Sequence, residues 1–310
     1  MKIDMKNRKN LFIYDNAVQI IKNEFFGDMN LLPIIIKCTL HDGIMRALQQ
    51  SKMLDYMIFH GETCLQRIYG SDRLSEDLDF CVHKDISELT EFKHFCKHFE
   101  TVLRDYLTKE YAIENSDIFF REPKNDMSIV KEGDVFTWKI GMRVSLGEQQ
   151  QLIKIDLENR EPITSVIKHF TKLHGDAFSH NNIFVKVETA EELLANKFIS
   201  FFQRPKLQYR DFYDIGFLSG ICHNAFNETI LYQKIIRRFS VNSFIDKIQV
   251  RSNLFDNMDN FIMCLRNELI RFITIQKYTT CFTNDMIEYT KNMINEGVTL
   301  CYSMFDARSK

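Results

Sequence analysis

The pattern of apolar positions divides the chain into two parts with different periods. In the first part, segments with apolar residues at helical spacing are interspersed with short segments in which apolar and polar residues alternate. The predicted helices in this part are 32–51, 64–69 and 86–109. The predicted strands are 55–60, 77–82, 111–121, 134–146 and 151–158. This mixture of helices and strands predicts an α/β (α+β) fold with a mixed sheet.

From about Glu188 onward the period is helical almost without interruption, with Phe, Leu and Ile recurring three and four residues apart. The polar stretch 179–182 just before this change is typical of a connector. We therefore predict a mixed-sheet lobe at 1–185 and a helical lobe at 186–310. Thr189 and Glu192 fit a capping box, which defines the start of the first helix of the second lobe.

The composition favours a globular protein of the cytoplasm. Hydrophobic residues make up 45% of the chain, and the eight cysteines form no C-x-x-C pair, so we expect reduced thiols. No apolar run has the length of a secretory signal or a membrane span. The net charge of −2 argues against a large basic surface, so any contact with RNA must come from a local patch.

Asp77 and Asp79 are the strongest candidates for chemistry. They lie two residues apart on a predicted strand, so both side chains point to one face while Leu78 and Phe80 point to the core. Two adjacent carboxylates repel and raise the pKa of one another, which favours a bound cation. Carboxylate oxygens suit Mg²⁺ or Mn²⁺. The alternative is a surface strand with two solvated aspartates.

The segment before this pair resembles a phosphate-binding turn. A predicted strand runs into Gly61 and then into a helix, an arrangement that directs free backbone N–H groups toward an anion. Thr63 adds a hydroxyl group, and Arg73 lies between the turn and the carboxylate pair. A phosphate-binding turn followed by a metal-binding pair is what phosphoryl or nucleotidyl transfer requires.

These motifs are similar to the signature of the AbiEii/AbiGii toxin family within the nucleotidyltransferase superfamily. The matching segments are G-E-T-x-L at 61–65 and R-x-S-E-D-L-D-F at 73–80. The resemblance implies metal-dependent transfer of a nucleotide from an NTP, with Asp77 and Asp79 as the metal ligands. The residues placed near the nucleotide are Gly61, Thr63, Arg73 and Ser75. Glu62 stands where the family has a second glycine, and its charge should repel a triphosphate.

The segment 151–158 offers a third carboxylate. Its alternation predicts that Lys154, Asp156 and Glu158 face outward. Nucleotidyltransferases of this superfamily often carry a third acidic residue on a neighbouring strand, as a base toward the acceptor hydroxyl or as a metal ligand. Asp156 is the candidate for this role, with Glu158 behind it; the alternative is an ordinary solvated strand face.

Two further candidates come from the helical part. Lys197 falls on an apolar helix face, and E-x-L-x-A-x-K at 191–197 resembles the family motif that carries a phosphate-contacting lysine. R-D-F-Y-D-I at 210–215 resembles a family motif whose first aspartate, here Asp211, belongs to the active site. We expect Asp214 to be structural. For Lys197, the alternative is a side chain whose stem lies along the apolar face while its ammonium group reaches water. For the motif at 210–215, the alternative is an ion-pair pattern at the start of a helix.

The resemblance implies the toxin of a bacterial type IV toxin–antitoxin or abortive-infection system, with tRNA or other RNA as the acceptor and a separately encoded antitoxin as partner. Two other interpretations stay open. Glu62 favours a nucleotide-binding interaction module without turnover, and the weak basic balance favours a small-molecule acceptor, as in antibiotic nucleotidyltransferases.

Overall fold

The computed structural model divides the chain into two compact units, Met1–Val187 and Glu188–Lys310. It describes residues 5–82, 89–111, 118–121, 135–143, 150–171, 182–274, 277–278 and 282–306.

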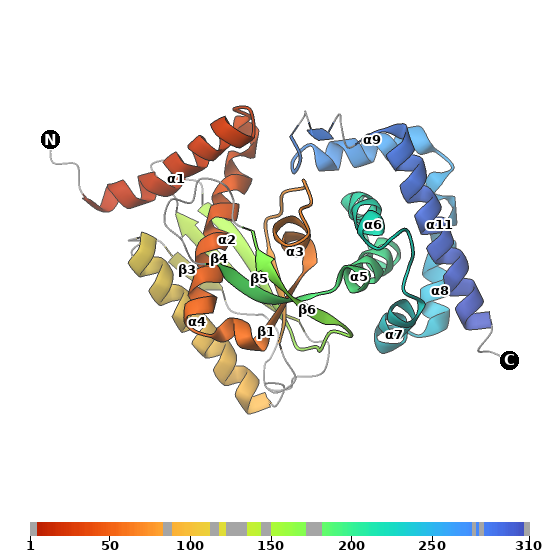
Figure 1. The fold of residues 1–310 in the computed structure, drawn as a ribbon, viewed down its shortest axis with the longest axis horizontal. Coiled ribbons are helices and arrows are strands. Elements are labelled where there is room, and N and C mark those ends of the chain that lie inside the picture. Colours follow the sequence, from red (N-terminus) through yellow and green to blue (C-terminus); the bar gives the residue numbers. More distant parts are fainter. Residues whose placement is uncertain are drawn as a thin grey trace. The chain divides into compact units, whose positions relative to one another are not determined.

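The described part of the first unit contains a sheet of seven strands in the order β3-β4-β5-β2-β1-β7-β6 (Figure 1). The strands are β1 (Met57–His60), β2 (Leu78–Val82), β3 (Ile118–Arg121), β4 (Val135–Arg143), β5 (Gln150–Glu158), β6 (Ser165–Phe170) and β7 (Ile183–Glu188). β2 runs antiparallel to β1 and parallel to β5, and β1 runs parallel to β7. The predicted mixed sheet and α/β class are thus confirmed.

Helices cover the apolar face of this sheet. They are α1 (Met5–Glu24), α2 (Leu32–Gln50) and α4 (Leu89–Tyr111), which lie together on one side of the strands (Figure 1). Phe92 of α4 packs against Phe136 of β4 with ring centroids 5.1 Å apart, and Phe99 packs against Trp138 at 5.9 Å. Phe92 and Phe99, both buried, lie on one side of α4 at helical spacing. These contacts leave the opposite face of the central strands for polar residues.

Several predicted boundaries differ from the structure. The short helix α3 (Gly61–Arg67) begins at Gly61 rather than at Cys64, and β2 begins at Leu78, one residue after Asp77. β6, β7 and α1 were not predicted at all. β6 could not be predicted from the pattern because five of its six residues are exposed, so its sequence S-V-I-K-H-F shows no alternation of apolar and polar residues. Parts of four predicted segments lie outside the described residues: 86–88 of a helix, 112–117 of one strand, 134 and 144–146 of another, and 179–181 of the connector.

The second unit is helical, as predicted. Its helices include α5 (Ala190–Gln203), α6 (Arg210–Ile221), α7 (Glu228–Arg238), α8 (Val241–Val250), α9 (Met258–Leu269) and α11 (Asn284–Asp306). The hydroxyl of Thr189 accepts a hydrogen bond from the backbone N–H of Glu192, so the predicted N-cap of α5 is confirmed. Throughout the described residues, the helices are too short or too polar to pass through a lipid bilayer.

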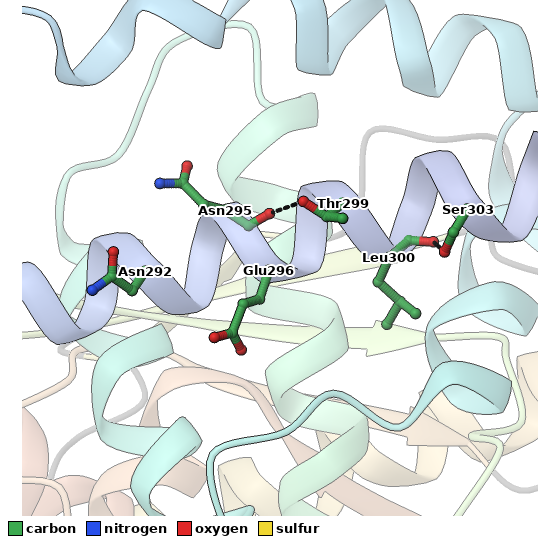
Figure 2. A pocket seen from close by; sticks show the side chains of 6 residues that line it. All are labelled: Asn292, Asn295, Glu296, Thr299, Leu300 and Ser303. Carbon is green, nitrogen blue, oxygen red and sulfur yellow. Dashed lines mark hydrogen bonds between the residues drawn. The ribbon is translucent and has the colours of Figure 1, made fainter.

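An open hollow of about 580 Å³ lies along α11 (Figure 2). It is lined by Asn292, Asn295, Glu296, Thr299, Leu300 and Ser303. The hydroxyl groups of Thr299 and Ser303 donate to carbonyls of the same helix, those of Asn295 and Leu300. The hollow is therefore a polar helix face whose hydroxyl donors are already bonded.

His41 of α2 makes the stability of the first unit sensitive to acid. It is fully buried, its Nε2 lies 3.1 Å from the carbonyl of Glu76, and its Nδ1 has no hydrogen-bond partner among the described residues. Burial, together with the positive charge of Arg67, lowers the pKa of His41 to about 3. The unfolded chain, with the ordinary value of 6.5, binds this proton first, so stability falls as the pH drops from 6.5 toward 3.

We expect the His41→Gln variant to lose this acid sensitivity. Because glutamine does not titrate and its amide can still donate to Glu76, the variant should lack a loss of about 1.4 kcal/mol per pH unit in that window. Urea unfolding at a series of pH values measures the difference. His98→Gln, at an exposed position of α4, is the matched control and should follow the wild type. Identical acid curves for all three proteins would contradict the assignment.

Candidate active site

The sheet brings three acidic residues from distant parts of the sequence onto one face. Asp79 of β2 lies directly opposite Asp156 of the parallel strand β5. Asp77, two residues before Asp79, is held beside them because its Oδ1 accepts a hydrogen bond from the backbone N–H of Lys154 at 3.3 Å. Leu78 and Phe80, between and after the two aspartates, are fully buried on the other face, as predicted. Asp77, Asp79 and Asp156 therefore form one group, which we call the carboxylate trio.

Lys154 is the cation in contact with the trio. Its ammonium group pairs with Oδ2 of Asp156, and its backbone binds Asp77. Oδ1 of Asp156 is buried and has no hydrogen-bond partner in the described part of the chain. Among the residues that the structure describes, one ammonium group faces three carboxylates, so the trio has excess negative charge and an acceptor oxygen to spare. A hard divalent cation such as Mg²⁺ fits this donor set.

The pKa values follow from this imbalance. Burial raises the pKa of Asp79, and the charges of Asp156 and Asp77 raise it further, to about 8. Burial also raises the pKa of Asp77. For Lys154, burial lowers the pKa but the hydrogen bond to Asp156 and the charges of the trio outweigh it, so the net shift is upward. Carboxyl groups with raised pKa values on a partly exposed sheet face are typical of functional sites.

Gly61 allows the turn between β1 and α3 to approach Asp79 closely. Its backbone is left-handed, with φ of +76°, and a Cβ atom at this position would overlap the Asp79 carboxylate and lie 2.9 Å from the Asp79 Cβ. Only glycine satisfies both conditions. The predicted turn residue is thus in direct contact with the trio.

The other residues predicted near the nucleotide are buried beneath this turn. The hydroxyl groups of Thr63 and Ser75 bond each other at 2.8 Å, and Thr63 also donates to the backbone carbonyl of Asp77. Arg73 is buried, and its guanidinium contacts Glu62 with Nη1 3.0 Å from Oε2. The charge of Glu62 is therefore compensated by an arginine of the same unit, which weakens the expected repulsion of a triphosphate.

In the helical unit, Lys197 lies between two buried carboxylates. Its ammonium nitrogen is 3.0 Å from Oδ1 of Asp211 and 2.7 Å from Oδ2 of Asp214, and both aspartates are fully buried. The counter-charges that Lys197 needs on its apolar face of α5 thus come from α6. Arg204 adds a second positive charge, with Nε 3.4 Å from Asp211.

We expect the Lys197→Ala variant to destabilise the helical unit by about 3–5 kcal/mol, because it leaves two buried carboxylates facing each other with less counter-charge. Urea unfolding followed by circular dichroism measures the loss. Adding Asp214→Asn should restore part of it. Lys291→Ala is the control: Lys291 pairs with the exposed Glu288 at 3.6 Å, and its loss should cost less than about 1 kcal/mol. Equal losses in the two lysine variants would contradict the prediction.

Comparison with known proteins assigns the chain to a family. A family model described as "Nucleotidyl transferase AbiEii toxin, Type IV TA system" matches residues 43–261, which include the carboxylate trio, Lys197 and Asp211. The chain belongs to this family. It is a nucleotidyltransferase, as the sequence motifs predicted.

Two crystal structures are similar to the AbiEii chain at low identity. JHP933 from Helicobacter pylori is 17% identical, with a TM-score of 0.44 over 88% of this chain and 94% of that one. A proposed nucleotidyltransferase from H. pylori is 19% identical, with a TM-score of 0.40 over 83% of this chain and 94% of that one. A comparison with curated proteins finds no match.

The AbiEii site contains features that the motifs did not reveal. Lys154 was expected only to face outward, yet it holds both Asp77 and Asp156; its position two residues before Asp156 on one strand face was the available signal. Glu158 shares the sheet face of Asp156, as predicted, but it is not solvated there: it is 8% exposed and pairs with Arg160 at 2.8 Å. A buried carboxylate needs such a partner, and alternation along one strand cannot show it.

Proposed function

We propose that this AbiEii protein transfers a nucleotide from an NTP to a hydroxyl group of an RNA acceptor, with tRNA the favoured substrate, in a reaction that depends on Mg²⁺ or Mn²⁺. The observation that carries the proposal is the grouping of Asp77, Asp79 and Asp156 on one sheet face with Lys154 against them. Three carboxylates held together against their mutual repulsion are suited to a divalent cation, which in turn binds a polyphosphate.

Asp77 and Asp79 would hold the metal ion, which supplies charge neutralisation and orientation of the phosphates when bound. Asp156 would accept the proton of the attacking hydroxyl or serve as a third ligand. In the transfer, the acceptor oxygen forms a bond to the α-phosphorus of the NTP while the bond from that phosphorus to the bridging oxygen breaks. The nucleotide remains on the acceptor, and pyrophosphate leaves with the electron pair.

The phosphates of the NTP would lie at the turn formed by Gly61. The backbone of Gly61 comes so close to Asp79 that an added Cβ would overlap the carboxylate, so phosphates bound at this turn would lie beside a metal ion held by Asp79. Thr63, Ser75 and Arg73 would act on the nucleotide through the shape of this turn, because their polar groups already have partners. Thr63 bonds to Ser75 and to the carbonyl of Asp77, and Arg73 bonds to Glu62.

The family motifs support a role for Lys197 and Asp211 as well. Lys197 would neutralise charge that develops on the triphosphate, and Asp211 would assist the acceptor. The ammonium group is already oriented by two carboxylates in its own unit, which restricts its rotamers before a substrate binds.

The family implies a type IV toxin with an antitoxin partner and a nucleotide substrate. We further propose that the enzyme works in the cytoplasm, where NTPs and RNA occur. A small-molecule acceptor is the second candidate, favoured by the net charge of −2. A module without turnover was favoured by Glu62 alone, and the contact of Glu62 with Arg73 weakens that argument.

The test incubates the protein with each α-labelled NTP, Mg²⁺ and either total RNA, purified tRNA or a pool of small metabolites. We expect label to appear in tRNA, with pyrophosphate released in equal amount, and to disappear in Asp77→Asn. Asp55→Asn, an exposed carboxylate of the same unit, is the control and should transfer normally. Label in small molecules alone would favour the second candidate. Tight NTP binding without pyrophosphate release from any pool would overturn the enzyme assignment.

A further inference from the structure

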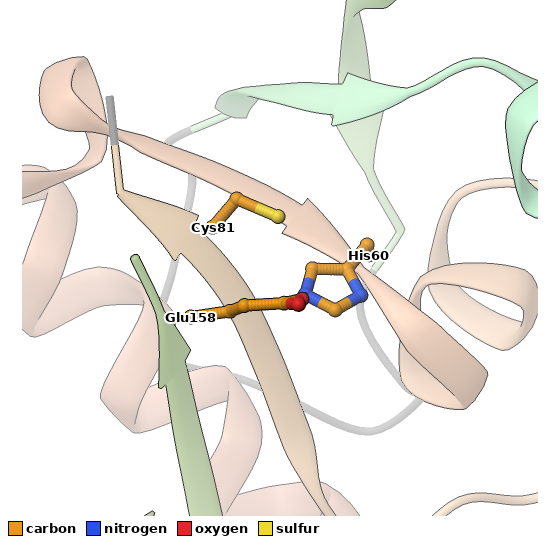
Figure 3. Close-up of side chains that lie close together, drawn as sticks. All are labelled: His60, Cys81 and Glu158. Atoms are coloured by element: carbon orange, nitrogen blue, oxygen red, sulfur yellow. The ribbon is translucent and has the colours of Figure 1, made fainter. Parts of the chain in front are cut away.

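A second group of ligand-type side chains lies next to the carboxylate trio. His60 ends β1, Cys81 is in β2 and Glu158 ends β5, and their ligand atoms all lie within 4.8 Å of one another (Figure 3). Cys81 and Glu158 are directly opposite each other across the β2–β5 pair. Cys81 follows Asp79 by two residues and Glu158 follows Asp156 by two, so these two residues occupy the next row of the same sheet face.

The three side chains come from three neighbouring strands, which fixes their Cα positions. His60 is the direct partner of Asp79 in the β1–β2 pair, and its ring turns toward the Glu158 carboxylate, with Nε2 3.8 Å from Oε2 (Figure 3). Phe59 and Phe80, adjacent in sequence to this row, are buried and pack on each other at 5.1 Å on the opposite face. This packing holds the strands that carry the group.

The donor set differs in kind from the carboxylate trio. A thiolate, an imidazole nitrogen and a carboxylate oxygen are the ligands of zinc, whereas magnesium takes oxygen ligands. In a tetrahedral zinc site with bonds of about 2.0–2.3 Å, neighbouring ligand atoms are about 3.3–3.8 Å apart. The ligand atoms, which all lie within 4.8 Å of one another, would draw closer on metal binding to reach this geometry.

The surroundings also suit a bound metal ion. Cys81 is fully buried, while the side chains of His60 and Glu158 are 15% and 10% exposed, which leaves a direction for a water molecule as fourth ligand. Arg160 lies with Nε 2.8 Å from Oε2 of Glu158 and so holds the carboxylate in place. Groups that hold a ligating carboxylate in position are common in metal sites.

We propose that His60, Cys81 and Glu158 bind a zinc-type transition metal ion, as a site separate from the carboxylate trio. The proposal is independent of nucleotide transfer, since it concerns ligands of a different class. Binding releases the thiol proton of Cys81, because the thiolate is the form that coordinates zinc.

The test titrates the metal-free full chain with Co²⁺, which takes the place of zinc and absorbs light. We expect one equivalent to give a near-ultraviolet thiolate-to-cobalt band and the visible bands of a tetrahedral ion, both removed by Zn²⁺ and unaffected by excess Mg²⁺. Cys81→Ser should lose the thiolate band. His60→Gln should keep that band but weaken Co²⁺ binding at least tenfold, and it tests the site if the serine variant fails to fold.

Two controls separate this site from others. Cys38→Ser removes a buried cysteine of α2, where serine can keep the hydrogen bond to the carbonyl of Ser75, and should retain the full band. Asp79→Asn should also retain it, so that a loss of nucleotide transfer leaves this proposal untouched. Absence of the thiolate band in the wild type, or an unchanged band in Cys81→Ser, overturns the zinc site.

Discussion

Asp79→Asn should lower the rate of nucleotide transfer at least about 10³-fold at saturating NTP. Asparagine keeps the size of the side chain but removes the charge that, with Asp77, would hold the metal ion against the phosphates. Charge stabilisation by a bound metal contributes several kcal/mol to a transition state, and each 1.4 kcal/mol is about a factor of ten in rate. Single-turnover transfer to the labelled acceptor measures the loss.

The same substitution should stabilise the metal-free protein. Asp79 has its pKa raised to about 8, from an ordinary value of 3.8, by burial and by the neighbouring carboxylates. The unfolded chain therefore loses this proton at lower pH than the folded chain, so the wild type loses stability as the pH rises from 4 to 8. Asparagine has no such charge, and we expect a gain on the order of 2 kcal/mol at pH 8 and none near pH 4.

Urea unfolding at both pH values, without divalent metal, checks the gain. The exposed Asp55→Asn variant is the control and should change neither rate nor stability. Added Mg²⁺ should stabilise the wild type and leave Asp79→Asn almost unaffected, because a ligand stabilises only the protein that binds it. An Asp79→Asn variant that transfers nucleotide at the normal rate would remove the carboxylate trio from the mechanism.

Gly61→Ala should impair both folding and transfer. The left-handed backbone costs an alanine about 1–2 kcal/mol, and the added Cβ would overlap the carboxylate of Asp79. Forcing that side chain or the turn aside adds about 1–3 kcal/mol. A displacement of Asp79 by about 1 Å should lower transfer about 10²-fold, since misplacement on this scale disrupts the reacting geometry.

Gly70→Ala is the matched control for this prediction. Gly70 has a similar left-handed φ of +81°, but nothing lies within 4 Å of an added Cβ. It should show the backbone cost alone, about 1–2 kcal/mol, with transfer unchanged. The difference between the two variants isolates the contact with Asp79. If the Gly61→Ala and Gly70→Ala variants lose the same stability and both transfer nucleotide normally, the close approach of Gly61 to Asp79 has no role in function.

The helices and strands that the sequence predicted correctly are those with a clear period. α4 and β5 were found because one side of each is buried, so their apolar residues repeat at 3.6 or 2 residues. β6 was not found, because it is exposed on nearly its whole length and no burial imposes alternation on its sequence.

The sequence by itself determined the local part of the site. The spacing of Asp77 and Asp79, two residues apart across a buried Leu78, already places both carboxylates on one face, because a strand has a fixed period. The motifs around them also indicated the family, and the family model that matches residues 43–261 confirms it.

Only the tertiary structure decided which distant groups meet this pair. The β2–β5 pairing brings Asp156 opposite Asp79 and Lys154 against Asp77, across 77 residues of chain. The structure likewise pairs Glu62, which was expected to repel a triphosphate, with the buried guanidinium of Arg73. Strand order and register depend on how the whole sheet packs against its helices, and no local period records them.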